Sequence, residues 1–414
     1  MTARPIRVAI LHQGFIPHYR VRLYELLNQL SPTTRYVVFH GAPASNSGWT
    51  AAEGPFAFPN RRVRNRELHL GKWLAIYQPV IREILAGEYD VVVLGHEVKF
   101  LSNTLLALLC RARGIPVLYW GLGYHLRENF AFTSKSKRWV DWLATRIKNA
   151  LTRLADGYLV YTTGGAQQLA EVGFPPERTF VLRNTIDISA QCRIYDSLAG
   201  TDPAALREAL GLRPDSVVLI FMGRLVDDKH VEVLIEAVTR INRQAGSQPP
   251  VEALIVGSGP MRDALERQAS GDPAVKFLGP IFDDAVIAQY IKVAAAVVIP
   301  GRAGLAINHA LAQGRPVITR QHRVQGPELE YISHDVNGLI IEGDVDTFVS
   351  ILARFVASPD WQCQLSDGAL RSRDGLRMES MAQQFDEAVR FVLARSATPA
   401  INATTAARSG AEVN

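Results

Sequence analysis

Short runs of apolar and β-branched residues alternate with longer helical patterns along almost the whole chain. Such alternation is typical of parallel strands joined by crossover helices that cover both faces of a sheet. The pattern therefore predicts an α/β protein with doubly wound, Rossmann-like sheets. The chain has 414 residues, enough for two sizeable cores, so we expect two such domains.

The expected strands fall into two sets, at 8–11, 36–39, 91–94, 117–120 and 158–161, and at 217–221, 253–256, 275–278, 296–299 and 317–319. Between the sets, residues 188–203 show little apolar periodicity, so we place an interdomain linker there, between domains at 1–187 and 204–377. A last helix is expected at 378–394, packing back on the N-terminal domain. The tail at 395–414 lacks the apolar content to pack, which predicts disorder.

The composition limits the classes of partner and compartment. The net charge of +5 favours anionic partners such as phosphates or acidic membrane surfaces. The three cysteines are too far apart in the sequence for a disulfide framework or a metal site, which fits a reducing compartment. No stretch approaches the ~20 apolar residues of a spanning helix. We therefore expect a cytoplasmic protein whose membrane contact, if any, is peripheral, and no nucleic-acid partner.

The first candidate binding segment is FMGRLVDDKHVEVLIEAV, in which a strand ends at Gly223, a polar loop follows and an amphipathic helix begins near His230. Ligands of open α/β sheets bind at the carboxyl ends of the strands, where Arg224 and Lys229 would lie. Arginine suits a diphosphate by bidentate contact and lysine by its point charge. The alternative for this segment, taken alone, is a solvated basic loop.

Two further segments have small residues at expected strand ends. In VVIPGRAGLAINHALAQGRPVIT, Gly304 opens a helix whose free N–H groups would face an anion. In LIVGSGPMRDALE and the following VKFLGPI, Gly257 and Gly279 leave room for a flat group such as a nucleobase against the backbone. The alternative is ordinary packing of strand, turn and helix. None of these glycines belongs to a G-x-G-x-x-G fingerprint, which argues against a dehydrogenase.

In this order and spacing, the three segments resemble the C-terminal domain of glycosyltransferase family four, a GT-B group of nucleotide-sugar-dependent transferases. The match runs from about Val217 to Ile341 and includes the G-R-L loop, the V-G-S-G-P turn, the F-L-G strand end, the G-L helix start and PELEYISHDVNGLI. The N-terminal half is similar through the first strand with its glycine and through VLRNTID. The resemblance implies a GT-B fold, with two Rossmann-like domains facing a central cleft.

The resemblance also implies roles for individual residues. Arg224 and Lys229 would hold the diphosphate of a nucleoside-diphosphate sugar, and the backbone at Gly304 and Leu305 would hold its distal phosphate. Gly14 would approach that phosphate from the other domain. No metal and no further cofactor is expected.

The chain departs from the family pattern at two glutamates, which usually contact the donor sugar and ribose across the G-L helix start. Their positions are occupied here by Gly301 and His309, although a neutral His309 can still donate a hydrogen bond to a ribose hydroxyl. The family's catalytic histidine aligns with Leu122, and His125, three residues on, is our best candidate for that role. Glu330, eight residues before Gly338, matches another family glutamate.

Several other residues are weaker candidates. The histidines His12, His18, His40 and His96 also lie in the first half, but a single histidine is more often a surface or core residue than a catalytic one. The stretch 135–157, KSKRWVDWLATRIKNALTRLADG, suits an anionic bilayer as a basic amphipathic helix. Its alternative is a surface helix that packs its apolar face on the N-terminal sheet.

These observations predict a glycosyltransferase, of the retaining kind by the resemblance, that acts in surface polysaccharide or glycolipid assembly. If the stretch 135–157 binds a membrane, the acceptor is lipid-linked. Two alternatives stay open because Gly301 and His309 replace the glutamates. One is a nucleotide-sugar-binding protein without transfer activity, and the other is a GT-B nucleotide-sugar epimerase.

Overall fold

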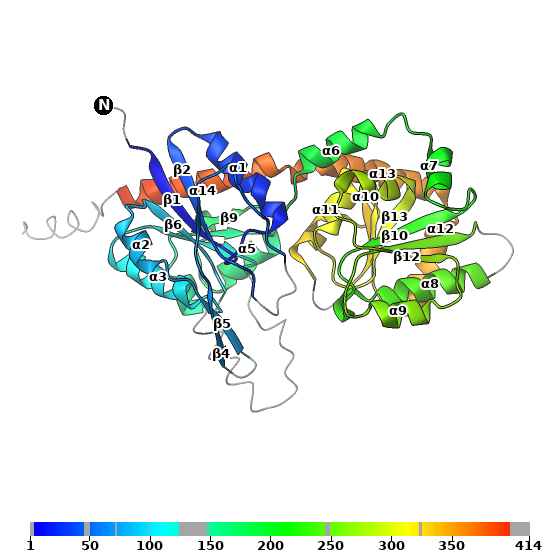
Figure 1. Cartoon of the computed structure of the whole chain (residues 1–414), viewed down its shortest axis with the longest axis horizontal. Coiled ribbons are helices and arrows are strands. Elements are labelled where there is room, and N and C mark those ends of the chain that lie inside the picture. Colours follow the sequence, from blue (N-terminus) through cyan, green and yellow to red (C-terminus); the bar gives the residue numbers. More distant parts are fainter. Residues whose placement is uncertain are drawn as a thin grey trace, which may run out of the picture. The chain divides into compact units, whose positions relative to one another are not determined.

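The computed structural model describes residues 4–44, 50–70, 73–97, 99–123, 146, 149–244, 249–322 and 325–397. The chain divides into two compact units (Figure 1). Unit 1 comprises Met1–Arg183 together with Glu379–Asn414, and unit 2 comprises Asn184–Met378. Each unit is built around its own sheet, and we describe the two separately.

The sheet of unit 1 has seven parallel strands in the order β3-β2-β1-β6-β7-β8-β9. The strands are β1 (Ile6–Leu11), β2 (Thr34–His40), β3 (Asn60–Arg62), β6 (Val91–Gly95), β7 (Val117–Gly121), β8 (Gly157–Val160) and β9 (Thr179–Val181). The helices include α1 (Val21–Leu30), α2 (Ile81–Ala86), α3 (Leu101–Ala112) and α5 (Thr163–Glu171). A separate antiparallel hairpin is formed by β4 (Arg66–Leu70) and β5 (Trp73–Tyr77).

The last helix, α14 (Met378–Ala397), packs on unit 1. The Tyr36 hydroxyl donates a hydrogen bond of 2.5 Å to Asp386, and the rings of Trp120 and Phe385 meet edge to face at 5.3 Å. This agrees with the packing expected for the helix at 378–394. The tail beyond residue 397 lies outside the described residues.

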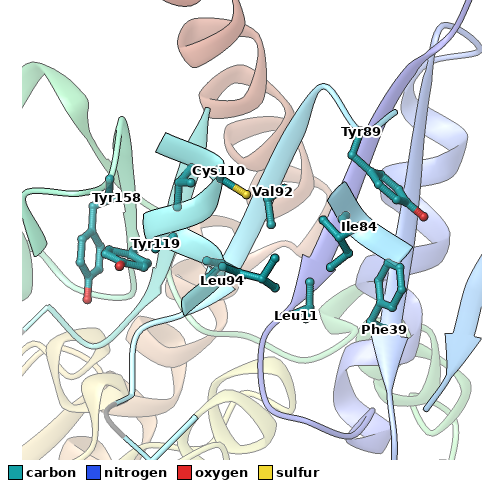
Figure 2. Packing of buried hydrophobic residues seen from close by; sticks show 14 of the residues in the cluster. Leu11, Phe39, Ile84, Tyr89, Val92, Leu94, Cys110, Tyr119 and Tyr158 are labelled. Atoms are coloured by element: carbon teal, nitrogen blue, oxygen red, sulfur yellow. The ribbon is translucent and has the colours of Figure 1, made fainter. Parts of the chain in front are cut away.

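The core of unit 1 explains why its central strands are almost wholly apolar. Every residue of β6, with the sequence VVVLG, is buried, because helices cover both faces of a parallel sheet. Figure 2 shows Leu11, Val92 and Leu94 of the sheet packed among residues that flank it. The aromatic members of this cluster are Phe39, Tyr89, Tyr119, Tyr158 and Phe174.

The sheet of unit 2 has six parallel strands in the order β12-β11-β10-β13-β14-β15. The strands are β10 (Val217–Met222), β11 (Val251–Val256), β12 (Val275–Gly279), β13 (Ala294–Ile299), β14 (Val317–Arg320) and β15 (Gly338–Ile341). The helices are α6 (Ile188–Ser197), α7 (Pro203–Ala209), α8 (Val231–Arg243), α9 (Arg262–Gln268), α10 (Asp284–Val293), α11 (Ala306–Ala312), α12 (Val345–Val356) and α13 (Pro359–Ser372).

Both sheets contain a topological switch point. In unit 1 the strand order reverses between β1 and β6, and in unit 2 it reverses between β10 and β13. The connections that leave two such neighbouring strands run to opposite sides, and ligands of open α/β sheets bind at the carboxyl ends of these strands. The residues after β10 and β13 therefore occupy the place in unit 2 where a ligand is most expected.

The doubly wound α/β architecture is confirmed, and all ten expected strands are present within a few residues of their predicted limits. The segment 188–203, expected as a linker, instead contains α6 and lies within unit 2. Asp187 caps α6 by accepting a hydrogen bond of 2.9 Å from the Ala190 N–H, and Ile188 is buried. Among the described residues, no helix has the length and apolarity to cross a membrane.

Candidate active site

The loop after β10 places two of the predicted cations at the switch point of unit 2. Leu225 is fully buried and anchors this loop, whereas the Arg224 side chain is exposed. A 3-10 turn, η5 (Asp227–Lys229), follows, and the ammonium group of Lys229 donates a hydrogen bond of 2.5 Å to the carbonyl oxygen of Arg302. Since Arg302 follows β13, this bond joins the ends of the two switch-point strands.

The loops after β10 and β13 are also joined through their backbones. The N–H of Gly301 donates to the carbonyl oxygen of Lys229 at 3.0 Å, and the N–H of Arg302 donates to that of Asp228 at 2.7 Å. A Cβ atom at position 301 would lie only 2.3 Å from the Asp228 carbonyl oxygen. Glycine at the first of the two missing glutamate positions is therefore required by the close approach of the two loops.

These loops bring three cations and two carboxylates together, and Arg302 lies 3.6 Å from the Asp228 carboxylate. Burial lowers the pKa of Lys229 below the usual range of a lysine, and the nearby Arg302 and Arg224 lower it further. The carboxylates of Asp228 and Glu328 oppose that shift. A lysine that is partly desolvated beside two arginines is suited to bind a multiply charged anion, because the anion relieves the repulsion among the cations.

Glu328 is a buried carboxylate that the sequence analysis missed. It lies in the 3-10 turn η6 (Pro327–Tyr331) with 3% of its surface exposed, and it accepts a hydrogen bond from the Asn184 amide. A Cβ atom at Gly326 would lie 2.7 Å from its second oxygen and 2.3 Å from the Ala303 carbonyl oxygen, so Glu328 sits beside the loop after β13. Glu330, chosen by its distance from Gly338, is exposed. The signal that the sequence offered for Glu328 was its place after Pro327, at the start of the segment PELEYISHDVNGLI.

Gly257 and Gly279 lie together beside the first loop. The Gly257 N–H donates to the Gly279 carbonyl oxygen at 2.8 Å. A Cβ atom at Gly257 would lie 1.8 Å from the Gly223 carbonyl oxygen, so a side chain there is excluded. Both glycines have positive φ, of 143° and 73°. Glycine at 257 is thus required by the close approach of the β10 and β11 ends, and the binding of a flat group here stays a prediction.

The segment after β13 places Gly304 and Leu305 before the seven-residue helix α11. A Cβ atom at Gly304 would meet no other atom within 4 Å, so this glycine borders open space. His309 lies one turn into α11, and burial lowers its pKa, opposed by Asp284 of α10. Its Nδ1 has no hydrogen-bond partner within the described part of the chain. His309 is therefore neutral at pH 7, and this unpartnered nitrogen is buried.

A histidine pair lies next to Lys229. His230 has a left-handed backbone conformation, with φ 50° and ψ 43°. Its Nδ1 lies 2.8 Å from a Glu232 carboxylate oxygen, and its Nε2 lies 3.2 Å from the Nε2 of His322, which follows β14. The Glu232 contact assigns the proton of His230 to Nδ1, so that Nε2 accepts from His322. The sequence carried no signal for this pair.

The switch point of unit 1 holds Gly14 and two structural histidines. Gly14 has φ 77°, and its carbonyl oxygen accepts from the Asn65 amide at 3.0 Å. His12 stacks on Trp120 at 3.7 Å, and its Nε2 lies 3.1 Å from the Tyr161 hydroxyl. Burial, with the nearby charges of Arg20 and Lys99, holds the pKa of His12 well below its usual value.

His96, which follows β6, stacks on Tyr119 at 4.3 Å, and its Nδ1 lies 2.9 Å from the Tyr158 hydroxyl. His125, the preferred catalytic histidine, lies outside the described residues, as does most of the basic stretch 135–157. Within the described ranges, no three His, Cys, Asp or Glu side chains are grouped so that they could hold a metal ion.

Two protein-family models match this chain, one in each unit. A model described as "Glycosyl transferase 4-like domain" matches residues 19–185, and one described as "Glycosyl transferases group 1" matches residues 216–358. The chain is a glycosyltransferase of the family-four type. The second match contains the three cations Arg224, Lys229 and Arg302 and the buried carboxylate Glu328.

Individual relatives of this glycosyltransferase cover most of its length. It is 27% identical to a D-inositol 3-phosphate glycosyltransferase of Kribbella flavida over 350 residues, which are 80% of this chain and 78% of the relative. A second enzyme of that name, from Thermobifida fusca, is 25% identical and covers 72% of this chain and 68% of its own length.

Solved structures confirm the GT-B fold with two Rossmann-like domains. HepE of Anabaena, crystallised with UDP, matches with a TM-score of 0.67 and 19% identity, over 93% of this glycosyltransferase and 100% of HepE. WaaG, a glycosyltransferase involved in lipopolysaccharide biosynthesis, matches with a TM-score of 0.63 and 16% identity, over 92% of this chain and 99% of WaaG.

Proposed function

We propose that this glycosyltransferase transfers a sugar from a nucleoside-diphosphate sugar bound by unit 2 to an acceptor hydroxyl, with retention of configuration. The observation that carries the proposal is the clustering of Arg224, Lys229 and Arg302 at the β10/β13 switch point. Two of these cations were predicted from the sequence for the donor diphosphate. The complexes of HepE with UDP and with UDP-glucose support a donor of this class.

The cluster suits the departure of a diphosphate. As the bond between the sugar and the diphosphate breaks, negative charge grows on the phosphate oxygens, and fixed cations stabilise it without reorganisation. The new bond forms between the sugar and the acceptor oxygen, and the acceptor's proton passes to the departing phosphate. Lys229 is held by the Arg302 carbonyl, so its charge is in place before the donor arrives.

The missing glutamates indicate how the donor differs from that of other family members. Gly301 offers no side chain to the sugar, and its backbone is already used to hold the Lys229 loop. His309 is neutral and carries no carboxylate, so any contact it makes with a ribose hydroxyl is an uncharged hydrogen bond. We therefore propose a donor sugar that is recognised without a carboxylate at position 301.

A nucleotide-sugar-binding protein without transfer activity is the second candidate. The absence of the two glutamates favours this candidate, because Gly301 and His309 remove both carboxylates from the proposed donor site. The two candidates share a ligand and differ only in turnover. For the transferase, a lipid-linked acceptor in polysaccharide or glycolipid assembly is proposed, and the role of WaaG in lipopolysaccharide biosynthesis supports it by analogy.

The test is thermal unfolding of the full chain against a panel of nucleoside diphosphates and their sugars, since a ligand of the native state raises the unfolding midpoint. The selected donor is then incubated with bacterial lipid extracts, and release of free nucleoside diphosphate is measured. A shift with one nucleotide and release that requires the lipid supports the transferase. A shift without release supports the binding protein, and no shift with any nucleotide contradicts both.

A further inference from the structure

Helix α3 of unit 1 has an apolar stripe that faces solvent. Leu101, Leu105 and Leu108 are 43%, 44% and 47% exposed, and their spacing of four and three residues places them on one side of the helix. The opposite side, with Leu106 and Cys110, is fully buried against the unit. A surface helix normally carries polar or charged residues on its outer face, so this stripe requires a partner or a function.

The hairpin β4–β5 extends the same surface. Its strand β5 is attached to the start of α3, because the Ile76 N–H donates to the Lys99 carbonyl oxygen at 2.7 Å and the Gln78 N–H donates to the Ser102 hydroxyl at 3.2 Å. Leu68 on β4 is 48% exposed. Figure 1 shows the hairpin projecting beyond the edge of the sheet of unit 1. We call Leu68, Leu101, Leu105 and Leu108 together the leucine surface.

Positive charges outnumber negative ones around the leucine surface, because Arg66, Lys99, Arg111 and Arg113 lie beside it together with Glu67, the neighbour of Leu68, and Glu97. Lys99 precedes α3, and Arg111 and Arg113 lie exposed at its end. Between Glu97, which pairs with Lys99 at 2.5 Å, and Glu128 the sequence contains no acidic residue. Apolar side chains between cations are the combination that binds an anionic bilayer surface, where leucines enter the acyl boundary and the cations meet lipid phosphates.

We propose that the leucine surface docks this glycosyltransferase on a bilayer that contains anionic lipids. Two other occupants fit the charges less well. A second copy of the chain, joined by a two-fold axis, would bring the cations of one copy against the same cations of the other. The chain's own stretch 135–153 contains six lysines and arginines against the single acid Asp141, so it would also meet like charge. The surface is distinct from the donor site of unit 2.

The experiment is co-sedimentation of the full chain with vesicles of phosphatidylcholine alone and of phosphatidylcholine mixed with phosphatidylglycerol. We expect binding to the mixed vesicles and a decrease of roughly ten-fold or more in the double variant Leu105→Glu/Leu108→Glu, because each change puts a charge where a leucine would insert. Both leucines are half-exposed, so the variant is expected to fold. Val336→Glu, at a valine 49% exposed in unit 2, is the matched control and should bind like the wild type.

Two results would overturn the proposal. One is equal binding of the wild type and the double variant to the mixed vesicles, and the other is a dimer of the free wild type in light scattering that the double variant abolishes. The nucleotide-induced shift in unfolding midpoint, measured in the same double variant, distinguishes the membrane-docking proposal from the donor-binding proposal. If that shift persists while vesicle binding is lost, the leucine surface acts in membrane docking and not in donor binding.

Discussion

Gly301 donates its backbone N–H to the carbonyl oxygen of Lys229, and this bond of 3.0 Å joins the loops after β13 and β10. A side chain at position 301 would displace Asp228 and, with it, the ammonium group of Lys229. We expect Gly301→Ala to destabilise unit 2 by about 1–3 kcal/mol, the usual cost of forcing atoms into a packed site, and to weaken nucleotide binding. Gly200→Ala, where a Cβ meets nothing within 4 Å, is the control. Chemical denaturation measures the stabilities of the two variants. If Gly301→Ala is as stable as the wild type, the loop contact is refuted.

Gly304 offers a contrasting test, because it borders open space. Gly304→Ala should leave the free energy of unfolding within ~0.5 kcal/mol of the wild type, as is usual for a substitution away from packed features. It should nevertheless weaken nucleoside-diphosphate binding, since the added methyl group occupies the space proposed for the distal phosphate. Calorimetric titration at fixed ionic strength measures the affinity. Unchanged affinity would show that the phosphate does not approach this backbone.

Lys229 predicts opposite pH dependences for binding and for stability. Its folded-state pKa is lowered from the ordinary lysine value, so the unfolded chain binds more protons between the two values and stability rises as pH increases through that window. Diphosphate binding requires the charged form, so affinity falls as pH rises through the lowered pKa. Lys229→Met, which carries no ammonium group, should remove both trends. Titrations and denaturation between pH 7 and 10 provide the comparison.

His12 predicts a loss of stability in acid. Its pKa is held well below 6.5 in the folded state, chiefly by burial, so the folded chain binds fewer protons than the unfolded chain below pH 6.5. The stability that the neutral His12 contributes is fully present above pH 6.5 and is lost as pH falls, with a limiting slope of about 1.4 kcal/mol per pH unit. His12→Gln should flatten this slope, whereas the exposed His69 provides a control as His69→Gln. Equal slopes for the wild type and His12→Gln would contradict the assignment.

The sequence predicted the parts of the fold that follow from apolar periodicity. The strands with continuous buried runs, such as β6 and β10, were found, because burial on both faces of a parallel sheet leaves only apolar residues. Strands β3, β9 and β15 and the β4–β5 hairpin were missed; β3 and β9 have only three residues each, and β3 is the polar NRR. Helix α6 was read as a linker because its mixed composition gave little periodicity, although the Asp187 cap was a usable signal.

The candidate site was predictable where a residue type and a strand end coincide. Arg224, Lys229 and Gly304 were predicted in this way; they follow β10 and β13 in the structure, and their roles in binding stay predictions. The contacts that depend on residues distant in the sequence were not predictable, since no periodicity links Lys229 to Arg302 or His230 to His322. The need for glycine at position 301 became visible only with the backbone of Asp228 beside it.

The most direct test of the donor site is calorimetric titration of the nucleoside diphosphate that the unfolding panel selects, into the wild type, Arg224→Ala, Lys229→Ala and the control Arg243→Ala, an exposed arginine at the far end of α8. Hydrogen bonds to charged groups contribute about 1.5–3 kcal/mol, so each of the first two variants should bind roughly ten-fold or more weakly, and the control should bind like the wild type. Unchanged affinity in both Arg224→Ala and Lys229→Ala would contradict the assignment of this cluster to the donor diphosphate.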